Sequence, residues 1–187
     1  DSPIINFDSL QVYQQLRILS SRPSIQDEKL IDHRLYGIID GNENCTVAKW
    51  LKLAKIEIEN CWKEKKIPIL VGGTGLYLKS LIQGISYIPD LSDSTIKNTE
   101  ASFLKNGANY LYDVLLEHNK NTTIKETDTQ RLKRSYSLLI ETGFSLEEWQ
   151  VKPEKIFESV NYKIILLNDD RSTIYEKAKI RFNSMIN

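Results

Sequence analysis

Apolar residues recur along this chain with two different periods, and each period predicts a different kind of element. Residues 67–71 form a nearly continuous apolar run rich in β-branched side chains, which is typical of a buried parallel strand. Gly72, Gly73 and Gly75 follow this run, and the apolar spacing becomes helical over residues 76–82. The stretch therefore predicts a strand, a glycine turn and a helix in succession.

Such a glycine turn has two interpretations. It can hold a phosphate, because a helix N-terminus offers free N–H groups and glycine lets the backbone come close to a ligand. It can also be a tight turn without any ligand, which the glycine pattern alone favours. A Walker motif needs Lys and Ser/Thr after its last glycine, whereas Leu76 and Tyr77 follow Gly75 here. The turn is therefore not a nucleotide P-loop by itself.

A second strand is predicted at residues 3–7, and the carboxylate of Asp8 follows it. Residues 47–62 have helical apolar spacing, so the order is strand, loop, helix, strand, as in a parallel α/β sheet. Since the carboxyl ends of parallel strands meet at one edge, we expect Asp8 to lie close to Gly73 and Thr74. Asp8 is either an N-cap or a general base or magnesium ligand, and the pattern leaves both open.

After Gly84 the pattern becomes helical. Helices are predicted at 94–105 and 108–119, and a further helix begins at a capping box of Thr127 and Gln130 and ends at Gly143. Residues 120–134 contain five basic and two acidic side chains. This cluster is either a solvated helix face or a phosphate grip made by arginines one turn apart. Beyond it we expect a strand at 162–167 and an amphipathic helix at 172–185.

Composition narrows the functional classes. The 187 residues are 41% hydrophobic, which is enough for one core with a small insertion, and 25 basic residues balance 25 acidic ones. A polyanionic partner would therefore have to bind a local patch. Cys45 and Cys61 lack metal-ligand spacing and are read as reduced thiols. No apolar run is long enough to span a membrane, so we expect a cytoplasmic protein without a membrane partner.

Three segments in order resemble motifs of the bacterial tRNA dimethylallyltransferases, also called tRNA isopentenyltransferases. They are Asp-Ser-Leu-Gln-Val-Tyr at 8–13, Pro-Ile-Leu-Val-Gly-Gly-Thr-Gly-Leu-Tyr at 68–77, and Asp-Thr-Gln-Arg-Leu-Lys-Arg at 128–134 followed by Glu-Thr-Gly at 141–143. The resemblance implies transfer of the dimethylallyl group of dimethylallyl diphosphate to N6 of the adenine beside the tRNA anticodon, with Mg²⁺. The implied partner is the anticodon stem-loop, and we expect a monomer.

The resemblance also implies the architecture. We expect an α/β fold with a P-loop-NTPase-like parallel sheet, which is a nucleotide-binding (ATP-binding) type of core. Residues 1–86 and 127–187 would form this core, and residues 87–126 a helical insertion that contacts tRNA. The family begins with a strand and a Gly-Pro-Thr-x-x-x-Gly-Lys-Ser/Thr P-loop that have no counterpart in this sequence. We therefore expect a fragment that lacks this P-loop and the C-terminal segment and is inactive alone.

Residue roles follow from the same resemblance. Asp8 would be the catalytic base and a possible metal ligand, and Gly73, Arg131 and Arg134 would contact the diphosphate. The implied tRNA contacts, allowing one inserted residue before Lys97, are Asp8, Ser9, Leu10, Gln11, Thr74, Lys97, Gln130, Arg131, Leu132, Lys133 and Arg134. Two departures exist: residues 19–23 read Leu-Ser-Ser-Arg-Pro instead of Gly-Thr-Ala-Lys-Pro, which weakens any role for Arg22, and Thr129 replaces a common proline.

Two other functions remain open. A P-loop-type small-molecule kinase would share the core, although the basic helical insertion would have no obvious purpose there. A non-catalytic RNA-binding module would explain residues 130–134 but not the meeting of Asp8 with the glycine turn. The enzymatic interpretation predicts that Asp8, Thr74 and the arginine pair converge on a single cleft.

Overall fold

The computed structural model describes residues 2–150 and 153–186, and these divide into two compact units. One unit comprises the chain up to Gln83 together with the chain from Lys155 onward, and the other runs from Gly84 to Glu154. The expected boundary at residue 127 is therefore displaced, because residues 127–154 belong to the same unit as the helical insertion. The cause is the packing of α5 (Thr129–Thr142) against α4 (Asp93–His118).

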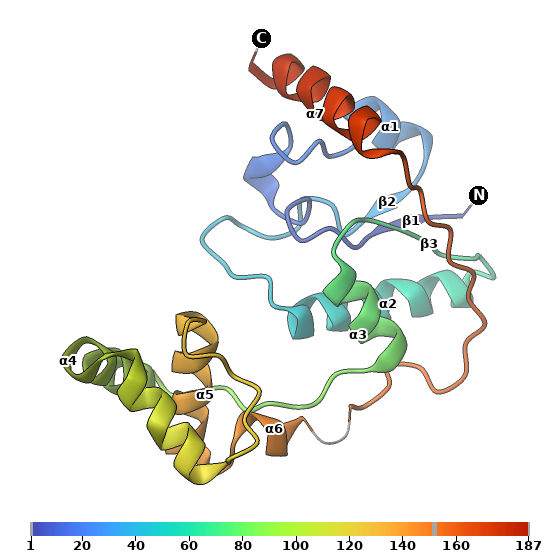
Figure 1. Ribbon diagram of the computed structural model, residues 1–187. Coiled ribbons are helices and arrows are strands. Elements are labelled where there is room, and N and C mark those ends of the chain that lie inside the picture. The colour runs from blue at the N-terminus through green and yellow to red at the C-terminus, as the bar shows by residue number, and fades with distance from the viewer. Residues whose placement is uncertain (1, 151–152, 187) are drawn as a thin grey trace. The chain divides into compact units, whose positions relative to one another are not determined.

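The first unit is built on a parallel sheet of three short strands, β1 (Ile4–Asn6), β2 (His33–Arg34) and β3 (Ile69–Val71). Their order is β2-β1-β3, with Ile4 opposite both His33 and Ile69 (Figure 1). The predicted α/β class and parallel pairing are confirmed. Burial of the last strand was predicted wrongly, since Ile69 and Val71 of this edge strand are each 48% exposed.

Helices α2 (Val47–Lys63) and α3 (Gly75–Gln83) pack against each other in this unit. Helix α2 begins where Thr46 accepts a hydrogen bond from the Lys49 amide, and its apolar stripe is buried as the spacing predicted. Trp50 of α2 is fully buried, donates its indole N–H to the Asn6 carbonyl at 2.9 Å, and stacks on Tyr77 of α3 with ring centroids 4.6 Å apart. These contacts attach the helices to β1.

Two short elements lie between β1 and β2, the 3₁₀ helix η1 (Gln14–Leu16) and α1 (Ile25–Leu30). A capping box of Ser24 and Asp27 starts α1, because each side chain accepts a hydrogen bond from the backbone N–H of the other residue. The residues between 34 and 47 form a loop without regular structure apart from an isolated bridge between Tyr13 and Ile39. The connection from β1 to β2 is therefore long, whereas the turn from β3 to α3 is short.

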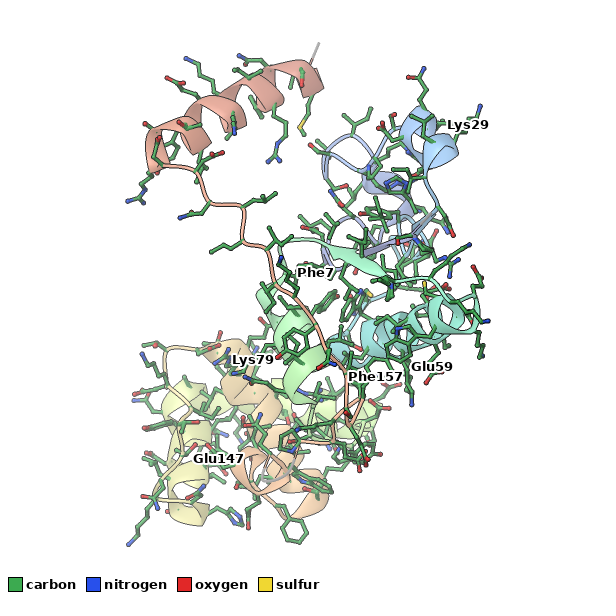
Figure 2. The ribbon with its side chains drawn as sticks, turned by 90° about the vertical axis from the view of Figure 1, so that its right-hand side faces the viewer. Phe7, Lys29, Glu59, Lys79, Glu147 and Phe157 are labelled. Carbon is green, nitrogen blue, oxygen red and sulfur yellow. The ribbon has the colours of Figure 1, made fainter. Side chains whose placement is uncertain are left out.

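The C-terminal part of the first unit departs from expectation. The strand predicted at 162–167 does not form, because no neighbouring strand within the described residues pairs with it, and its apolar side chains are exposed. Phe157, which is labelled in Figure 2, lies upstream of it. Its ring packs edge-on against Trp62 of α2 with ring centroids 4.8 Å apart. The last helix is present as α7 (Arg171–Ile186). Within the described ranges, no helix combines the length and the apolar character needed to cross a bilayer.

The second unit consists of α4, α5 and the short α6 (Leu146–Trp149). Gly107 interrupts α4 with φ +82° and ψ 178°, a conformation open to glycine, so the two predicted helices are confirmed on either side of it. The core of the unit contains Leu111, Leu115, Ile124, Leu132, Tyr136 and Leu139.

Helix α5 begins one residue later than predicted. Its N-cap is Asp128, whose carboxylate accepts from the Arg131 amide, and not Thr127. Asp is as good an N-cap as Ser or Thr, so the two adjacent candidates compete and the local backbone decides. Gly143 ends the helix in the left-handed conformation with φ +76°, as predicted.

Candidate functional site

The site begins at the turn that leaves β1, where the carboxylate of Asp8 folds back onto its own chain. Asp8 Oδ1 accepts hydrogen bonds from the amides of Leu10 at 2.8 Å and Gln11 at 3.3 Å. This is the capping role that the sequence left open, and it uses one of the two carboxylate oxygens. No hydrogen bond among the described residues involves the other oxygen, Oδ2. Asp8 can therefore cap its turn and still accept a proton.

The glycine turn after β3 meets the Asp8 turn directly. The Thr74 hydroxyl accepts from the Ser9 amide at 2.9 Å and donates to the Ser9 hydroxyl at 3.2 Å. On the main chain, the Phe7 amide donates to the Val71 carbonyl at 2.9 Å and the Thr74 amide to the Phe7 carbonyl at 3.3 Å. The prediction that Asp8 and the glycine turn share one edge of the sheet is confirmed.

Gly72 permits this meeting. A Cβ at Gly72 would lie 2.5 Å from the Phe7 carbonyl carbon and 2.7 Å from the Asp8 nitrogen, closer than any side chain can come. The absence of a Cβ at Gly72 therefore lets the turn after β3 approach the backbone of Phe7 and Asp8. It does not serve to admit a phosphate. Gly73 has a different surrounding: its Cβ would lie 3.6 Å from Asp8 Oδ2, so Gly73 borders the open carboxylate oxygen.

Two tyrosines contribute to the electrostatics around Asp8. Burial raises the pKa of Tyr36 above its usual value, and the negative charge of Asp8 raises it further. The pKa of Tyr77 is raised by burial and by its interaction with the Cys45 side chain, with smaller contributions from Tyr13 and Asp8. Its hydroxyl donates to the Cys45 carbonyl at 3.1 Å. Both phenols therefore stay neutral at physiological pH, so neither adds a negative charge that would compete with the carboxylate.

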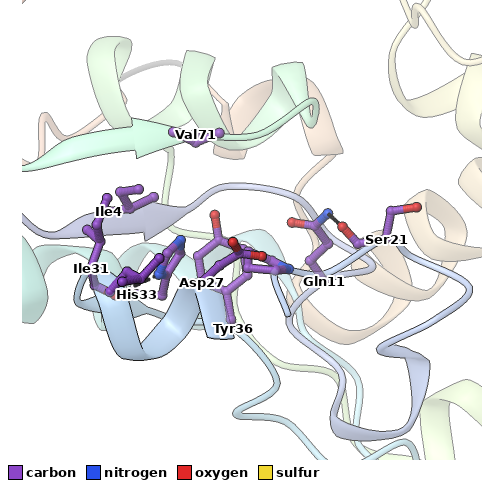
Figure 3. A pocket seen from close by; sticks show the side chains of 10 residues that line it. Ile4, Gln11, Ser21, Asp27, Ile31, His33, Tyr36 and Val71 are labelled. Atoms are coloured by element: carbon purple, nitrogen blue, oxygen red, sulfur yellow. Dashed lines mark hydrogen bonds between the residues drawn. The ribbon is translucent and has the colours of Figure 1, made fainter. Parts of the chain in front are cut away.

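Gln11 lines a hollow of about 430 Å³ between the sheet and α1 (Figure 3). Its amide N–H₂ group donates to the carbonyls of Ser20 at 2.9 Å and Ser21 at 3.2 Å, so this nitrogen serves to hold the loop. Tyr36 lines the same hollow. The contact of Gln11 with tRNA stays a prediction, for which the side-chain oxygen is available.

Arg22, which the sequence left without a secure role, is packed inside its loop. Its guanidinium lies against the backbone of Gly37, where a Cβ would come within 1.5 Å of Nη1, and Gly37 has φ +59°. Arg22 also forms an ion pair with Glu28 at 3.7 Å, while burial and the neighbouring Arg17 lower its pKa. Arg22 is therefore a structural residue of the loop.

The second unit carries the remaining predicted contacts, and their environments differ. Arg131 is 77% exposed and pairs loosely with Asp128 at 3.4 Å, and Gln130, Arg134 and Lys97 are exposed as well. Lys133 is tied down, because it forms an ion pair with Glu100 at 2.8 Å and lies over the Phe103 ring. The side chain of Leu132 is fully buried in the core, so it packs the helix instead of contacting RNA.

The structure therefore brings together one group of predicted residues, namely Asp8, Ser9, Gly73 and Thr74, with Leu10 and Gln11 in the same turn. Arg131 and Arg134 belong to the other compact unit. Their convergence with Asp8 stays a prediction.

The described residues do not form a complete metal site. They contain no group of three or more His, Cys, Asp or Glu side chains placed to hold an ion, and Asp8 supplies a single carboxylate. Mg²⁺ in phosphate-transfer and related sites is commonly held by one or two carboxylates together with substrate phosphates. A magnesium ion near Asp8 stays a prediction that requires ligands besides Asp8.

Sequence reasoning missed Asn6. It is the last residue of β1 and is fully buried. Its side chain hydrogen-bonds to both the backbone N–H and the backbone C=O of Asp8. The available signal was an amide side chain inside an otherwise apolar strand, because a buried polar group needs partners.

The Gly72 contact yields a direct prediction. Gly72→Ala should lower the free energy of unfolding by about 1–3 kcal/mol, because the new methyl group forces the ends of β1 and β3 apart. Gly75→Ala is the matched control: nothing lies within 4 Å of its Cβ position, and it begins α3. Chemical denaturation should show an unchanged or slightly raised midpoint for Gly75→Ala. Equal effects of the two substitutions would show that the close approach is unimportant.

Comparisons with known proteins all point to one protein family. The sequence pattern of the family described as IPP transferase matches residues 11–187. A tRNA dimethylallyltransferase of Pelagibacter ubique is 39% identical, covering 100% of this chain and 60% of the relative. One of Rickettsia bellii is 37% identical, covering 94% of this chain and 57% of the relative. The chain thus spans about 60% of the length of the curated relatives that it matches.

Solved structures agree. A tRNA delta(2)-isopentenylpyrophosphate transferase of Staphylococcus epidermidis is 25% identical with a TM-score of 0.54, covering 99% of this chain and 61% of that one. A eukaryotic dimethylallyltransferase acting on tRNA is 22% identical with a TM-score of 0.79, covering 99% of this chain and 46% of that one, and supports the fold. From the sequence match, the relatives and the shared fold, we conclude that this chain belongs to the IPP transferase family.

Proposed function

We propose that the protein containing this chain transfers the dimethylallyl group from dimethylallyl diphosphate to N6 of the adenine adjacent to the tRNA anticodon. The observation that carries this proposal is the joining of the Asp8 turn to Thr74, which leaves Asp8 Oδ2 open beside Gly73. Membership of the IPP transferase family and relatives named tRNA dimethylallyltransferase support the reaction class. We expect the enzyme to act as a monomer in the cytoplasm.

In the proposed reaction Asp8 acts as general base. The amine of adenine is a poor nucleophile, so it must be held against the allylic carbon while its proton is removed. The new bond joins N6 to that carbon, the carbon–oxygen bond to the diphosphate breaks, and the N6 proton passes to Asp8 Oδ2. Because Oδ1 is fixed by the Leu10 and Gln11 amides, Oδ2 has a defined direction.

The turn around Asp8 also supplies RNA contacts in this proposal. Leu10 is 56% exposed, and Gln11 has its side-chain oxygen available, so both can contact an extruded base. Flipping a base out of its stack costs a few kcal/mol and is cheapest where the base is unpaired. An anticodon loop offers such bases, and proteins that read RNA sequence generally target loops of this kind.

The departing diphosphate develops negative charge, and the proposal assigns its neutralisation to Arg131 and Arg134. Both side chains are exposed near the N-terminus of α5, where the helix dipole also favours an anion. Mg²⁺, if bound as expected, would neutralise further diphosphate charge. Gln130 and Lys97 are exposed in the same unit and are assigned to tRNA.

The role of Asp8 is tested by Asp8→Asn in the full-length enzyme. Asn can still cap the turn but cannot take the proton, so we expect kcat to fall by about 100-fold or more, while tRNA affinity stays within about threefold. The assay uses undermodified tRNA with labelled dimethylallyl diphosphate, or γ-labelled ATP for the kinase alternative. Asp113→Asn, which alters an exposed carboxylate, is the control. Near-normal transfer by Asp8→Asn would remove Asp8 from the mechanism.

The arginine pair is tested by comparing two cations on one helix. Arg131→Ala should raise the KM for dimethylallyl diphosphate about tenfold or more, because a charge-assisted hydrogen bond contributes about 1.5–3 kcal/mol. Lys133→Ala should change this KM little, because the Lys133 ammonium is already paired with Glu100. Steady-state kinetics with the full-length enzyme measures both. A KM and rate unchanged by Arg131→Ala would contradict the assignment.

A further inference from the structure

The side chain of Asn6 is engaged at both ends of its amide. Its oxygen accepts from the Asp8 amide at 2.8 Å, and its nitrogen donates to the Asp8 carbonyl at 3.0 Å and to the Leu35 carbonyl at 3.1 Å. The side chain is 0% exposed. Both N–H donors and the oxygen are thus used, which is nearly the full capacity of an asparagine. An amide buried in this way specifies one local geometry, since any shift leaves a buried polar group unpaired.

The bonds to Asp8 enclose that residue. The Asp8 N–H lies before its side chain and the Asp8 C=O after it, so one asparagine grips both peptide groups that flank the carboxylate-bearing carbon. Rotation of either group would turn the carboxylate away from Gly73. The Leu10 and Gln11 amides then orient the carboxylate itself. Asn6 therefore sets where the Asp8 backbone lies, and the amides set where its oxygens point.

The third bond reaches the turn that follows β2. Leu35 is a buried, bulky residue with φ +63°, a left-handed conformation that costs roughly 1–2 kcal/mol for such a residue. Its carbonyl is held by Asn6 at 3.1 Å. Such strain persists only where the surroundings impose it, and it concentrates at functional sites. Tyr36 comes next in the chain, so Asn6 ties the turn bearing Tyr36 to the turn bearing Asp8.

We propose that Asn6 is a positioning residue for the reaction, which fixes the Asp8 carboxylate by joining the turns after β1 and β2 without touching either substrate. This inference rests on the proposed function of Asp8. Misplacing a reacting group by about 1 Å can cost roughly 100-fold in rate. Loss of the Asn6 bonds should therefore appear in kcat and leave the KM values for tRNA and dimethylallyl diphosphate nearly unchanged.

The experiment compares Asn6→Ser with Asn6→Ala in the full-length enzyme. The two variants have similar size, so both lose volume and leave the Leu35 carbonyl without its Asn6 partner. In the parent the Asn6 oxygen accepts from the Asp8 amide. Of the two substitutes, only serine has a side-chain oxygen that can accept from this amide. We expect kcat to fall about 100-fold in Asn6→Ala and about tenfold or less in Asn6→Ser, with both KM values within about threefold of the parent.

Trp50→Phe is the stability control. It removes the indole N–H that donates to the Asn6 carbonyl and leaves the Asn6 side chain in place. It should lower the unfolding midpoint while keeping kcat within about threefold of the parent enzyme. If Asn6→Ala does not fold, Asn6→Ser is compared with Trp50→Phe, and a lower kcat for Asn6→Ser is expected.

The outcomes separate the two proposals. Equal kcat values for the serine and alanine variants, or a loss that follows the unfolding midpoint in all three variants, would reduce Asn6 to a structural residue. Parent-like kcat in Asn6→Ala would overturn the inference outright while leaving the proposed function intact. Absence of dimethylallyl transfer by the unaltered full-length enzyme would overturn the proposed function, and the role of Asn6 with it.

Discussion

The backbone contact between the end of β3 and the end of β1 is the constraint on which the candidate site depends. Gly72 has its backbone so close to Phe7 and Asp8 that no Cβ fits between them. The approach lets Thr74 reach Ser9, and these bonds fix the spacing between the carboxylate turn and the glycine turn. Two loops that are distant in sequence thereby become one surface.

On that surface the two oxygens of the Asp8 carboxylate have different roles. Asp8 Oδ1 is held by backbone amides, and Oδ2 stays available beside Gly73. The pKa values of Tyr36 and Tyr77 are raised in part by the negative charge of Asp8. Both phenols therefore stay protonated and add no second negative charge beside the carboxylate. A structural cap and a proton acceptor are therefore compatible in one residue, although the sequence presented them as alternatives.

The sequence predicted those parts of the fold that local periodicity determines. The apolar stripe of α2, the turn into α3, the break at Gly107 and the end of α5 at Gly143 all follow from side-chain spacing or from glycine conformation. The strand expected at 162–167 failed because strand formation requires a hydrogen-bonding neighbour, which no local pattern reveals. The unit boundary failed for a similar reason, since α5 packs on α4 through contacts between distant residues.

The candidate site was likewise predictable only in part. Topology alone placed Asp8 and Thr74 at one edge, because parallel strands align their carboxyl ends. The charge pattern offered Arg131 and Arg134 as a phosphate grip, and their exposure suits that contact. The resemblance to a family added Leu132, whose buried side chain does not suit an RNA contact. The polar amide of Asn6 in an apolar strand could have drawn attention, but its bond to Leu35, 29 residues away in the chain, could not be predicted from the local sequence.

The most direct test of this account is a structure of the full-length enzyme bound to an anticodon stem-loop and an unreactive analogue of dimethylallyl diphosphate. The account predicts that Asp8 Oδ2 lies within about 3.2 Å of the adenine N6, and that Arg131 and Arg134 contact the diphosphate. An adenine bound with N6 beyond the reach of Asp8, even through one water molecule, would contradict it.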